Sequence, residues 1–307
     1  MTRALVIGLG SIGLRHQTLL REMGIEVHAV SRRGGEGCFS SEPEAVRVVK
    51  PDYAVIATET TDHLPALARL AETGFNGRLL MEKPLFGQAA DMPANCFASV
   101  HVAFPLRFNP GLMQLKEHLT NQDILSAEFY VGQYLPDWRP GRDYRSVYSA
   151  RRAAGGGVLR DLSHELDLAN WLLGPWRSIA ALGGQWSPLE IDSDDVFALL
   201  GRFTHCRAAT LQLNYLDRIS QRRVVVNTAD HSYAIDLIAG TLKIDREPAF
   251  NWPADRNATM IAMHRAVLGF GAGAACDLAG GLMADRLAVA AEKAAATGCW
   301  VGAEDSP

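Results

Sequence analysis

The chain has 307 residues, of which 48% are hydrophobic, and a net charge of −4 at pH 7. This length favours two domains of roughly 150 residues each, and the scattered charges exclude the basic face that nucleic-acid or membrane-surface partners need. No apolar run approaches the roughly 20 residues that cross a bilayer, and five scattered cysteines indicate neither disulfides nor a zinc site, so we expect a cytoplasmic protein without a metal that acts on small molecules.

The first hundred residues alternate short apolar strands with helices, which is the rhythm of a parallel sheet covered by helices. Strands are predicted at residues 3–7, 26–30, 53–57, 78–81 and 97–103, and helices at 11–23, 43–49 and 62–72. This pattern is typical of a Rossmann doubly wound parallel sheet. Pro105 and Pro110 mark a change of rhythm, so we predict a dinucleotide-binding domain over residues 1–104 and a second domain over 105–307.

The second region contains longer strands joined by short turns, which predicts a mostly antiparallel open sheet. The strands are expected at residues 124–134, 178–186, 195–203, 207–216, 222–228 and 232–238. Helices are expected at 159–173 and 277–297, the latter with Gly298 as its C-cap. The predicted fold class is therefore α/β plus α+β, with an N-terminal Rossmann sheet and a C-terminal α/β domain.

The sequence GLGSIG places Gly8, Gly10 and Gly13 at G-x-G-x-x-G spacing after the first strand, with Ser11 and Ile12 between them. The first glycine would make the tight turn, the second would let a pyrophosphate approach the backbone, and the third would let the helix pack closely on the strand. The free N–H groups of the following helix favour bound phosphate. An isolated motif is often only a glycine turn, but here a strand and a helix flank it.

The end of the second strand carries Ser31, Arg32 and Arg33, where an NAD-binding domain usually has an acidic residue for the ribose 2′-hydroxyl. A hydroxyl and two guanidiniums can bind a 2′-phosphate through charge-assisted hydrogen bonds. We therefore predict a nicotinamide dinucleotide cofactor, with NADP preferred over NAD. The alternative interpretation is a solvated basic loop.

The stretch MEKPL places Glu82, Lys83 and Pro84 after the strand at 78–81, at the carboxyl edge of the parallel sheet where ligands bind. Lys83 would then face the nicotinamide, as a proton donor or as a hydrogen-bond donor to a substrate oxygen. Pro84 restricts the backbone, and a cis Lys83–Pro84 bond is an allied hypothesis. On these residues alone, a surface turn is the simpler interpretation.

The segment GGGVLRDLSHELD (155–167) leads from three glycines into a helix that carries Asp161, His164, Glu165 and Asp167. Residues three or four apart share a helix face, so Asp161 can meet His164, and His164 can meet Asp167. A histidine flanked by carboxylates is oriented and kept basic, which suits a proton shuttle. A lone histidine would more often be a core or surface residue.

The motifs GLGSIGLRH, VIATETTDH, MEKPL, PLRFNP and the GGG…D…H…D helix together resemble the glucose–fructose oxidoreductase, inositol dehydrogenase and rhizopine-catabolism family (Gfo/Idh/MocA) over nearly the whole chain. The resemblance implies hydride transfer between NAD(P) and a hydroxyl or ketone carbon of a sugar, sugar nucleotide or cyclitol. It also implies a homo-oligomer, a dimer or tetramer, formed through the C-terminal sheet.

The resemblance matches Lys83 to the lysine of the E-K-P signature, His164 to the acid/base histidine and Asp161 to the aspartate before it. The family helix commonly separates these last two by four residues, whereas here the interval is three. Glu165 therefore stays an alternative to His164 for the acid/base position.

Further candidates come from residues near these motifs. Tyrosines and guanidiniums suit hydroxyls, carboxylates or phosphates on a sugar, and the cluster WRPGRDYRSVY (138–148) is rich in both. A solvated loop is an equally simple interpretation of this cluster. The candidates are Thr58, Glu59 and His63 on the cofactor side, and Arg107, Asn109, Arg142 and Tyr144, beside Asp161 and His164, for the substrate.

Two other functional classes stay open. One is a nicotinamide-binding sensor or regulatory protein of the same fold without catalysis, although such proteins can lose the lysine or histidine and this chain has Lys83 and His164. The other is reduction of a tetrapyrrole or another conjugated system, against which the polar arginine and tyrosine cluster argues.

Overall fold

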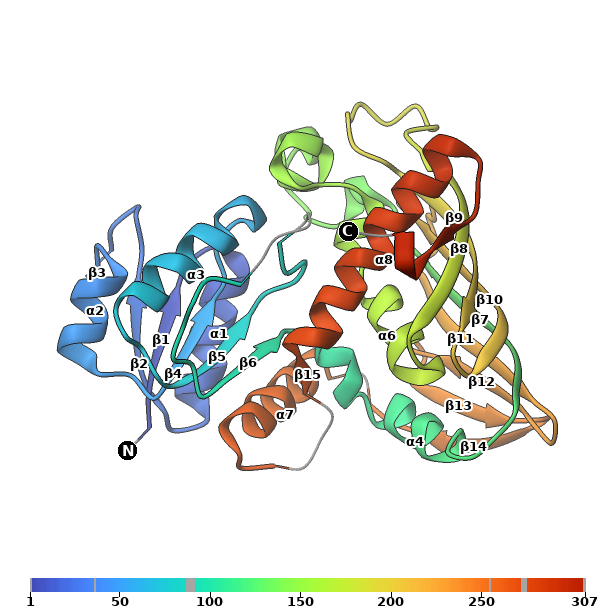
Figure 1. The fold of residues 1–307 in the computed structure, drawn as a ribbon, viewed down its shortest axis with the longest axis horizontal. Helices are drawn as coiled ribbons and strands as arrows, with labels where there is room; N and C mark the ends of the chain where they lie inside the picture. Colours follow the sequence, from blue (N-terminus) through green and yellow to red (C-terminus); the bar gives the residue numbers. More distant parts are fainter. Residues whose placement is uncertain (1, 36, 87–91, 254, 272–274, 306–307) are drawn as a thin grey trace. The chain divides into compact units, whose positions relative to one another are not determined.

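The computed structural model describes residues 2–35, 37–86, 92–253, 255–271 and 275–305, and Figure 1 shows its fold. The chain packs as two compact units, Met1–Phe108 with Asp255–Gly281, and Asn109–Ala254 with Leu282–Pro307. The segment 255–281 thus returns to the first unit from far along the chain, which no motif in the sequence indicated. The division into domains at residue 104 stays a prediction.

The first unit is built on a sheet whose strand order, over its described residues, is β15-β6-β5-β4-β1-β2-β3. The strands are β1 (Arg3–Ile7), β2 (Glu26–Val30), β3 (Cys38–Phe39), β4 (Tyr53–Ile56), β5 (Arg78–Met81), β6 (Ser99–Val102) and β15 (Cys276–Asp277). Neighbours pair in parallel, except that β15 pairs antiparallel with β6. From β1, the chain adds β2 and β3 on one side and then β4, β5 and β6 on the other. This reversal confirms the predicted Rossmann sheet and puts its switch point between β1 and β4.

Helices pack on this sheet and bury its strands. They are α1 (Ser11–Glu22), α2 (Glu42–Val49), α3 (His63–Glu72) and α7 (Arg256–Leu268), with the short turns η1 (Thr60–Asp62) and η2 (Pro105–Phe108). Residues 4–7 of β1 and all of β4 are no more than 2% exposed. Strands buried in this way read as continuous apolar runs, which is why the sequence pattern located them.

The second unit is built on a sheet with the order β14-β13-β12-β11-β7-β10-β9-β8-β16 among its described residues. The strands are β7 (Ile124–Gly132), β8 (Trp176–Gly184), β9 (Val196–Phe203), β10 (Cys206–Asn214), β11 (Gln221–Thr228), β12 (Ser232–Asp236), β13 (Thr241–Ile244), β14 (Glu247–Asn251) and β16 (Val301–Gly302). Every pair is antiparallel except β7 with β10. The predicted mostly antiparallel sheet is confirmed.

Helices cover one face of this second sheet (Figure 1). They are α4 (Pro110–His118), α5 (Val158–Asp161), α6 (His164–Leu173) and, from residue 282 on, α8 (Leu278–Thr297). Along β9, Phe197, Leu199 and Phe203 are buried, whereas Ala198 and Leu200 between them are exposed. This alternation shows that the opposite face is open.

The structure departs from the sequence-based elements at several places. The predicted strands agree with the observed ones to within two residues, but β3, β13, β14, β15 and β16 and the helices α4 and α7 were not predicted. The predicted helix 159–173 is interrupted at Leu162 and Ser163, which separate α5 from α6. The backbone of Leu162 lies outside the helical region, at φ −100° and ψ 26°.

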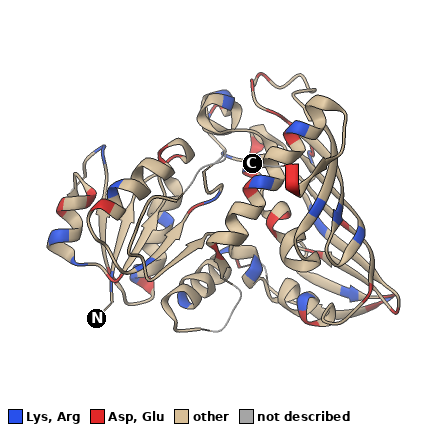
Figure 2. Cartoon of the chain, in the orientation of Figure 1, with Lys and Arg blue, Asp and Glu red and all other residues tan. Residues whose placement is uncertain are grey.

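Charged residues are interspersed in both units, without a block of one sign (Figure 2). Over the described ranges, no helix is both long and apolar enough to cross a membrane. In that same part of the chain, no group of three or more His, Cys, Asp or Glu side chains could hold a metal ion.

Candidate functional site

The predicted phosphate-binding turn joins β1 to α1. Gly8 has a φ of +94°, and a Cβ there would come within 2.7 Å of the Ala57 carbonyl oxygen, so this tight turn requires glycine. A Cβ on Gly13 would overlap the Gly8 carbonyl oxygen, so the third glycine lets α1 approach β1 closely. A Cβ on Gly10, by contrast, would have no neighbouring atom within 4 Å. The backbone therefore faces open space only at the glycine expected to meet a pyrophosphate.

The first turn of α1 suits an anion. Gly10 is the N-cap residue, and the first turn, which begins with the exposed Ser11 and the half-buried Ile12, contains no acidic residue. Unpaired N–H groups and the positive end of the helix dipole favour a phosphate at such a position.

His63 connects the turn after β4 with the turn after β5. Its Nδ1 lies 3.0 Å from the Pro84 carbonyl oxygen and 3.1 Å from that of Leu85, and its Nε2 lies 3.2 Å from the carbonyl oxygen of Thr58. The side chain is 1% exposed. His63 therefore holds the two turns together from inside the unit.

Glu82 and Lys83 follow β5 directly, and the Lys83–Pro84 peptide bond is cis. The Glu82 carboxylate has two partners, because His16 Nε2 lies 2.8 Å from its Oε1 and the Lys83 backbone N–H donates to its Oε2 at 3.2 Å. Burial raises the pKa of Glu82, but the hydrogen bond from His16 and the charge of Lys83 act in the opposite direction, and the pKa lies below its usual value. Glu82 is thus an ionised carboxylate beside Lys83. His16, in the quoted GLGSIGLRH stretch, is not among the predicted site residues.

Arg32 and Arg33 follow β2, and their side chains are 69% and 88% exposed. Arg32 Nη2 lies 3.2 Å from Asp62 Oδ2, and Arg33 Nη2 lies 3.8 Å from Glu59 Oε1. The neighbouring Ser31 is largely buried. Both guanidiniums that could receive a 2′-phosphate therefore already face a carboxylate, which the interpretation of the sequence did not take into account.

The predicted acid/base residues lie on two short helices of the second unit. Asp161 is the last residue of α5 and His164 is the first residue of α6. The prediction that one continuous helix carries both residues is therefore wrong. Asp161 Oδ2 accepts a hydrogen bond of 2.6 Å from the Tyr215 hydroxyl. Burial, followed by the Asp161 charge, raises the pKa of Tyr215 well above its usual value, so the phenol keeps its hydrogen and donates it.

Glu165, the alternative to His164, is 2% exposed and is bound by Arg222 on β11. Arg222 Nε donates to Oε1 at 2.7 Å and Nη2 donates to Oε2 at 2.9 Å. This two-bond arrangement uses both oxygens of the carboxylate. His164 is half-buried, so the geometry favours His164 over Glu165 as a group that could handle a substrate proton.

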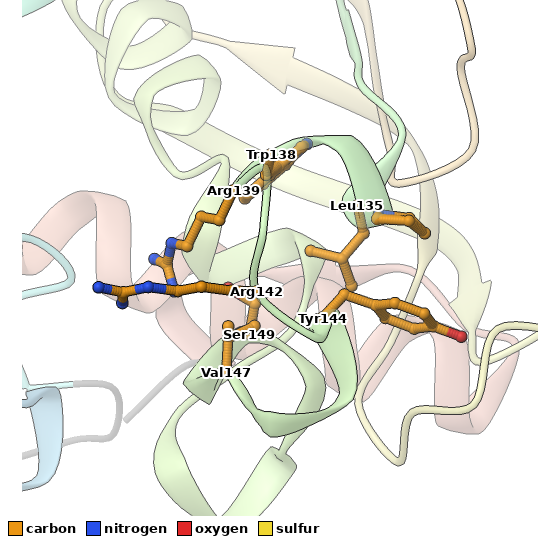
Figure 3. Close-up of a pocket in the computed structure, with 8 residues that line it drawn as sticks. Leu135, Trp138, Arg139, Arg142, Tyr144, Val147 and Ser149 are labelled. Carbon is orange, nitrogen blue, oxygen red and sulfur yellow. The ribbon is translucent and has the colours of Figure 1, made fainter.

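Arg142 and Tyr144 line a small hollow in the second unit (Figure 3). The other lining residues are Leu135, Pro136, Trp138, Arg139, Val147 and Ser149. The side chains of Arg139 and Arg142 extend in the same direction, and the Tyr144 ring lies on the opposite side (Figure 3). Two guanidiniums with this arrangement suit a carboxylate or phosphate group. Arg139 belongs to the arginine and tyrosine cluster but is not among the predicted residues.

Arg107 and Asn109, two further substrate candidates, are largely buried. Arg107 lies in η2 and is 9% exposed. Asn109 is the N-cap of α4, and its Oδ1 accepts hydrogen bonds from the backbone N–H groups of Gly111 at 3.0 Å and Leu112 at 3.2 Å. The Asn109 side chain thus has a structural role at the start of α4.

Parts of the sequence match known proteins. Residues 114–234 match the family model of the GFO/IDH/MocA C-terminal domain. The chain is 30% identical over 148 residues to levoglucosan dehydrogenase of Pseudarthrobacter phenanthrenivorans. That match covers 45% of this chain and 37% of the relative, so it spans well under half the length of the curated protein.

Solved structures share the whole fold. Levoglucosan dehydrogenase in complex with NADH and L-sorbose has a TM-score of 0.82 at 16% identity, and the match covers 99% of each chain. The WlbA dehydrogenase from Bordetella pertussis, in complex with NADH and UDP-GlcNAcA, has a TM-score of 0.77 at 17% identity and 98% coverage of each chain. At these identities the likeness concerns the fold. The match over residues 114–234 thus confirms the resemblance of the second unit to the Gfo/Idh/MocA family, and the whole chain shares the fold of these dehydrogenases.

Proposed function

We propose that this chain is an NAD(P)-dependent oxidoreductase that transfers a hydride between nicotinamide and a hydroxyl or ketone carbon of a sugar, sugar nucleotide or cyclitol. The observation that carries the proposal is the turn after β1, where Gly8 and Gly13 are sterically required and Gly10 leaves the backbone open beside a helix N-terminus. Similarity to a levoglucosan dehydrogenase supports a carbohydrate substrate. The NADH in the two similar structures supports a nicotinamide cofactor.

The first unit would hold the dinucleotide along the carboxyl edge of its sheet. The turn from Gly8 to Gly13 would bind the pyrophosphate through backbone N–H groups. Ser31, Arg32 and Arg33 would lie at the adenosine ribose, because they follow β2. We propose NADP as the preferred form, since guanidiniums bind a 2′-phosphate well. The phosphate would have to compete with the carboxylates that face the two arginines.

The nicotinamide end of the cofactor would lie toward the turns after β4 and β5. Thr58 and Glu59 follow β4, and Glu82, Lys83 and Pro84 follow β5. Strand β4 neighbours β1 and β5 neighbours β4, on the side of the switch point where the second half of a dinucleotide binds. His63 would support this region from beneath, because it connects both turns.

The chain's own residues would manage the oxygen and its proton. When bound, the nicotinamide supplies or accepts the hydride. Lys83 would donate a hydrogen bond to the substrate oxygen and stabilise the negative charge that develops there. His164 would take the hydroxyl proton during oxidation and return it during reduction. Asp161, fixed by the Tyr215 hydroxyl at the end of α5, would help to orient the segment in which His164 begins α6.

The second unit would bind the substrate. Arg142 and Tyr144 line the hollow shown in Figure 3, where Arg139 adds a second guanidinium. This pair of cations favours a substrate with a carboxylate or phosphate, such as a sugar acid or a sugar nucleotide, over a neutral sugar. We propose that Arg107 and Asn109 contribute to the substrate region, where Asn109 holds the start of α4.

We also propose that the chain forms a homo-oligomer through the open face of the second sheet. Leu182 on β8 is 66% exposed, and Leu200 on the adjacent β9 is 45% exposed. Trp300 is 49% exposed, and the Arg202 guanidinium lies 5.7 Å from its ring centroid. Apolar side chains gathered on neighbouring strands are typical of an interface. Light scattering should detect a dimer or tetramer that Leu200→Glu weakens.

The decisive experiment is a turnover assay with NAD and NADP across sugars, sugar acids, cyclitols and nucleotide sugars, followed by absorbance of the reduced nicotinamide. We expect turnover of at least one carbohydrate, with the charged ones preferred. A fluorescence titration with NADH and NADPH measures binding independently. Tight dinucleotide binding without any turnover would instead support the alternative, a sensor or regulatory protein of the same fold.

A further inference from the structure

Four polar side chains of the first unit form a continuous hydrogen-bonded chain that ends beside Lys83. The Tyr53 hydroxyl lies 2.8 Å from His264 Nδ1, His264 Nε2 lies 2.9 Å from His16 Nδ1, and His16 Nε2 lies 2.8 Å from Glu82 Oε1. Tyr53, His16 and His264 are each 0% exposed. The other Glu82 oxygen accepts the Lys83 backbone N–H. We refer to Tyr53, His264, His16 and Glu82 as the buried relay.

The buried relay connects elements that are far apart in the sequence. Tyr53 lies on β4, His16 on α1, Glu82 after β5, and His264 on the returning helix α7. The His16 and His264 rings are nearly perpendicular, with centroids 5.0 Å apart. The turn that carries Lys83 is therefore tied to the packing of α7 on α1.

A second polar contact joins α7 to α1 next to the relay. Arg15, beside His16, donates to the Arg256 carbonyl oxygen at 2.7 Å and to Asn257 Oδ1 at 2.9 Å. These two residues open α7, whereas His264 lies in its later half. Helix α7 thus contacts α1 at two points, which fixes the position of His264 relative to His16.

The positions of the hydrogens in the relay follow from the charge of Glu82, the one ionised member. An ionised Glu82 can only accept, so His16 must carry its hydrogen on Nε2. If both rings are neutral, His16 Nδ1 accepts from His264 Nε2–H, and His264 Nδ1 accepts from the Tyr53 hydroxyl. Protonation of Glu82 would reverse all three hydrogen bonds. The charge on Glu82 therefore sets the tautomers of both histidines.

The pKa directions agree with this arrangement. Burial lowers the pKa of His264 well below its usual value, so its ring is neutral. Burial, followed by the charge of Glu82, raises the pKa of Tyr53 well above its usual value, so its hydroxyl keeps its hydrogen. Because Tyr53 is 0% exposed, the relay ends inside the core. It is suited to orient Glu82 and not to conduct protons to solvent.

We propose that the buried relay is a positioning device for Lys83, in which Tyr53, His264 and His16 hold Glu82 in the orientation that fixes the Lys83 backbone for hydride transfer. The catalytic part of this inference rests on the proposed function, whereas the direction of the hydrogen bonds does not. His16 and Glu82 act through Lys83 and are positioning residues.

Ring-nitrogen NMR of the full chain labelled with ¹⁵N-histidine shows which atom donates and which accepts in each hydrogen bond of the relay. Near pH 7, we expect His16 and His264 to carry hydrogen on Nε2 and none on Nδ1. His16→Gln and His264→Gln assign the signals. Tyr53→Phe keeps the ring but removes the hydroxyl that donates to His264. It should therefore change the chemical shift of His264 Nδ1 more than that of His16 Nε2. A doubly protonated His16, or an Nδ1–H tautomer on either ring, would overturn the proposal.

The positioning role is tested by kinetics on His16 variants. A glutamine N–H can replace the Nε2–H donor to Glu82, so His16→Gln should keep kcat within about threefold of wild type. His16→Ala should lower kcat about tenfold or more at unchanged KM for the dinucleotide, because a small displacement of Lys83 slows transfer. His118→Ala, at an exposed histidine of the second unit, should leave both constants unchanged.

The outcomes separate the two proposals. Wild-type kcat in His16→Ala, or equal losses in the alanine and glutamine variants, would reject the positioning role. If His16→Ala does not fold, Glu82→Gln replaces it, since it keeps the size of the side chain and removes its charge; its kcat should fall about tenfold, and an unchanged kcat would reject the role. If wild type turns over no carbohydrate, the proposed function fails and the catalytic role falls with it, while the ring-nitrogen spectra still decide the direction of the relay.

Discussion

Arg222 binds both carboxylate oxygens of Glu165, at 2.7 and 2.9 Å, on the covered face of the second sheet. The next residue of β11, Arg223, pairs with Glu128 at 3.2 Å on the open face, where both side chains are more than 40% exposed. The period of two along a strand thus places two neighbouring arginines in opposite environments. Glu165 is fully engaged in a buried pair, which leaves His164 as the better acid/base candidate.

This pairing predicts a large stability cost for Glu165→Ala. Loss of the carboxylate leaves a half-buried guanidinium, 24% exposed, without this partner, so the free energy of unfolding should fall by about 1–3 kcal/mol. The matched control, Glu128→Ala, breaks an exposed pair and should cost less than about 1 kcal/mol. Urea denaturation measures both. Similar small losses in the two variants would make Glu165 an acid/base candidate again.

The glycines of the first turn predict two separable effects. Gly10→Ala places its Cβ in open space, so the fold should keep its stability while dinucleotide affinity falls, because the methyl group occupies the approach of the pyrophosphate. Gly13→Ala forces a clash with the Gly8 carbonyl oxygen and should destabilise the fold by about 1–3 kcal/mol. Thermal denaturation and NADPH titration distinguish the two, and unchanged affinity in Gly10→Ala would speak against a pyrophosphate at this turn.

The features predicted most accurately from the sequence are those that depend on local backbone requirements. The glycine turn could be anticipated because each glycine answers a steric demand within the β1–α1 unit, and the strands because buried strands are continuous apolar runs. Helix α7 was not predicted, although its buried residues recur at helical spacing, from Met260 and Met263 to Val267 and Leu268. Its place is set by contact with α1, far away in the chain. The Asn109–Pro110 pair is a helix-start signature that indicates the cap of α4.

Contacts between distant residues could not be anticipated in the same way. Nothing near His16 in the sequence points to His264, because their 2.9 Å contact spans 248 positions. The carboxylates of Asp62 and Glu59 face Arg32 and Arg33 only once β2 and β4 are neighbours of β1 in the folded sheet. Hydrophobic periodicity in the sequence describes one helix or strand at a time, whereas these ion pairs form between residues that follow two different strands.

Lys83→Ala should remove turnover while leaving dinucleotide binding nearly intact. Without the ammonium group, charge on the substrate oxygen is not stabilised, so kcat should fall about 10²- to 10³-fold, whereas the pyrophosphate contacts at the glycine turn remain. Initial rates and NADPH fluorescence titration measure the two effects. Lys243→Ala, at an exposed lysine on β13, is the control, and a normal rate in Lys83→Ala would show that the assigned role is wrong.

The arginines after β2 predict the choice between NADP and NAD. The double variant Arg32→Ala/Arg33→Ala should weaken NADPH binding about tenfold or more, because hydrogen bonds to charged groups contribute about 1.5–3 kcal/mol each, and should leave NADH binding nearly unchanged. Asp62→Asn removes a competing carboxylate from Arg32 and should tighten NADPH binding. Tighter binding of NADH than of NADPH by the wild type would reject the NADP preference.

The buried relay predicts how stability depends on pH. The pKa of His264 is lowered in the folded chain, so the unfolded chain binds more protons as the pH falls below about 6.5. The stability linked to His264 is therefore present above that pH and is lost on acidification, by at most ~1.4 kcal/mol per pH unit for one proton. The lowered pKa of Glu82 acts in the same direction, but only below about pH 4.3.

Urea denaturation between pH 7.5 and 5 isolates the histidine contribution, because Glu82 stays ionised throughout that range in both states. His264→Gln removes the titrating ring, so its free energy of unfolding should fall less steeply with acidification than that of the wild type. His118→Gln, at an exposed histidine, should retain the wild-type slope, which controls for the loss of one histidine. Since His16 and Tyr53 face His264 directly, an equal slope in wild type and His264→Gln would mean that the relay does not keep this ring neutral.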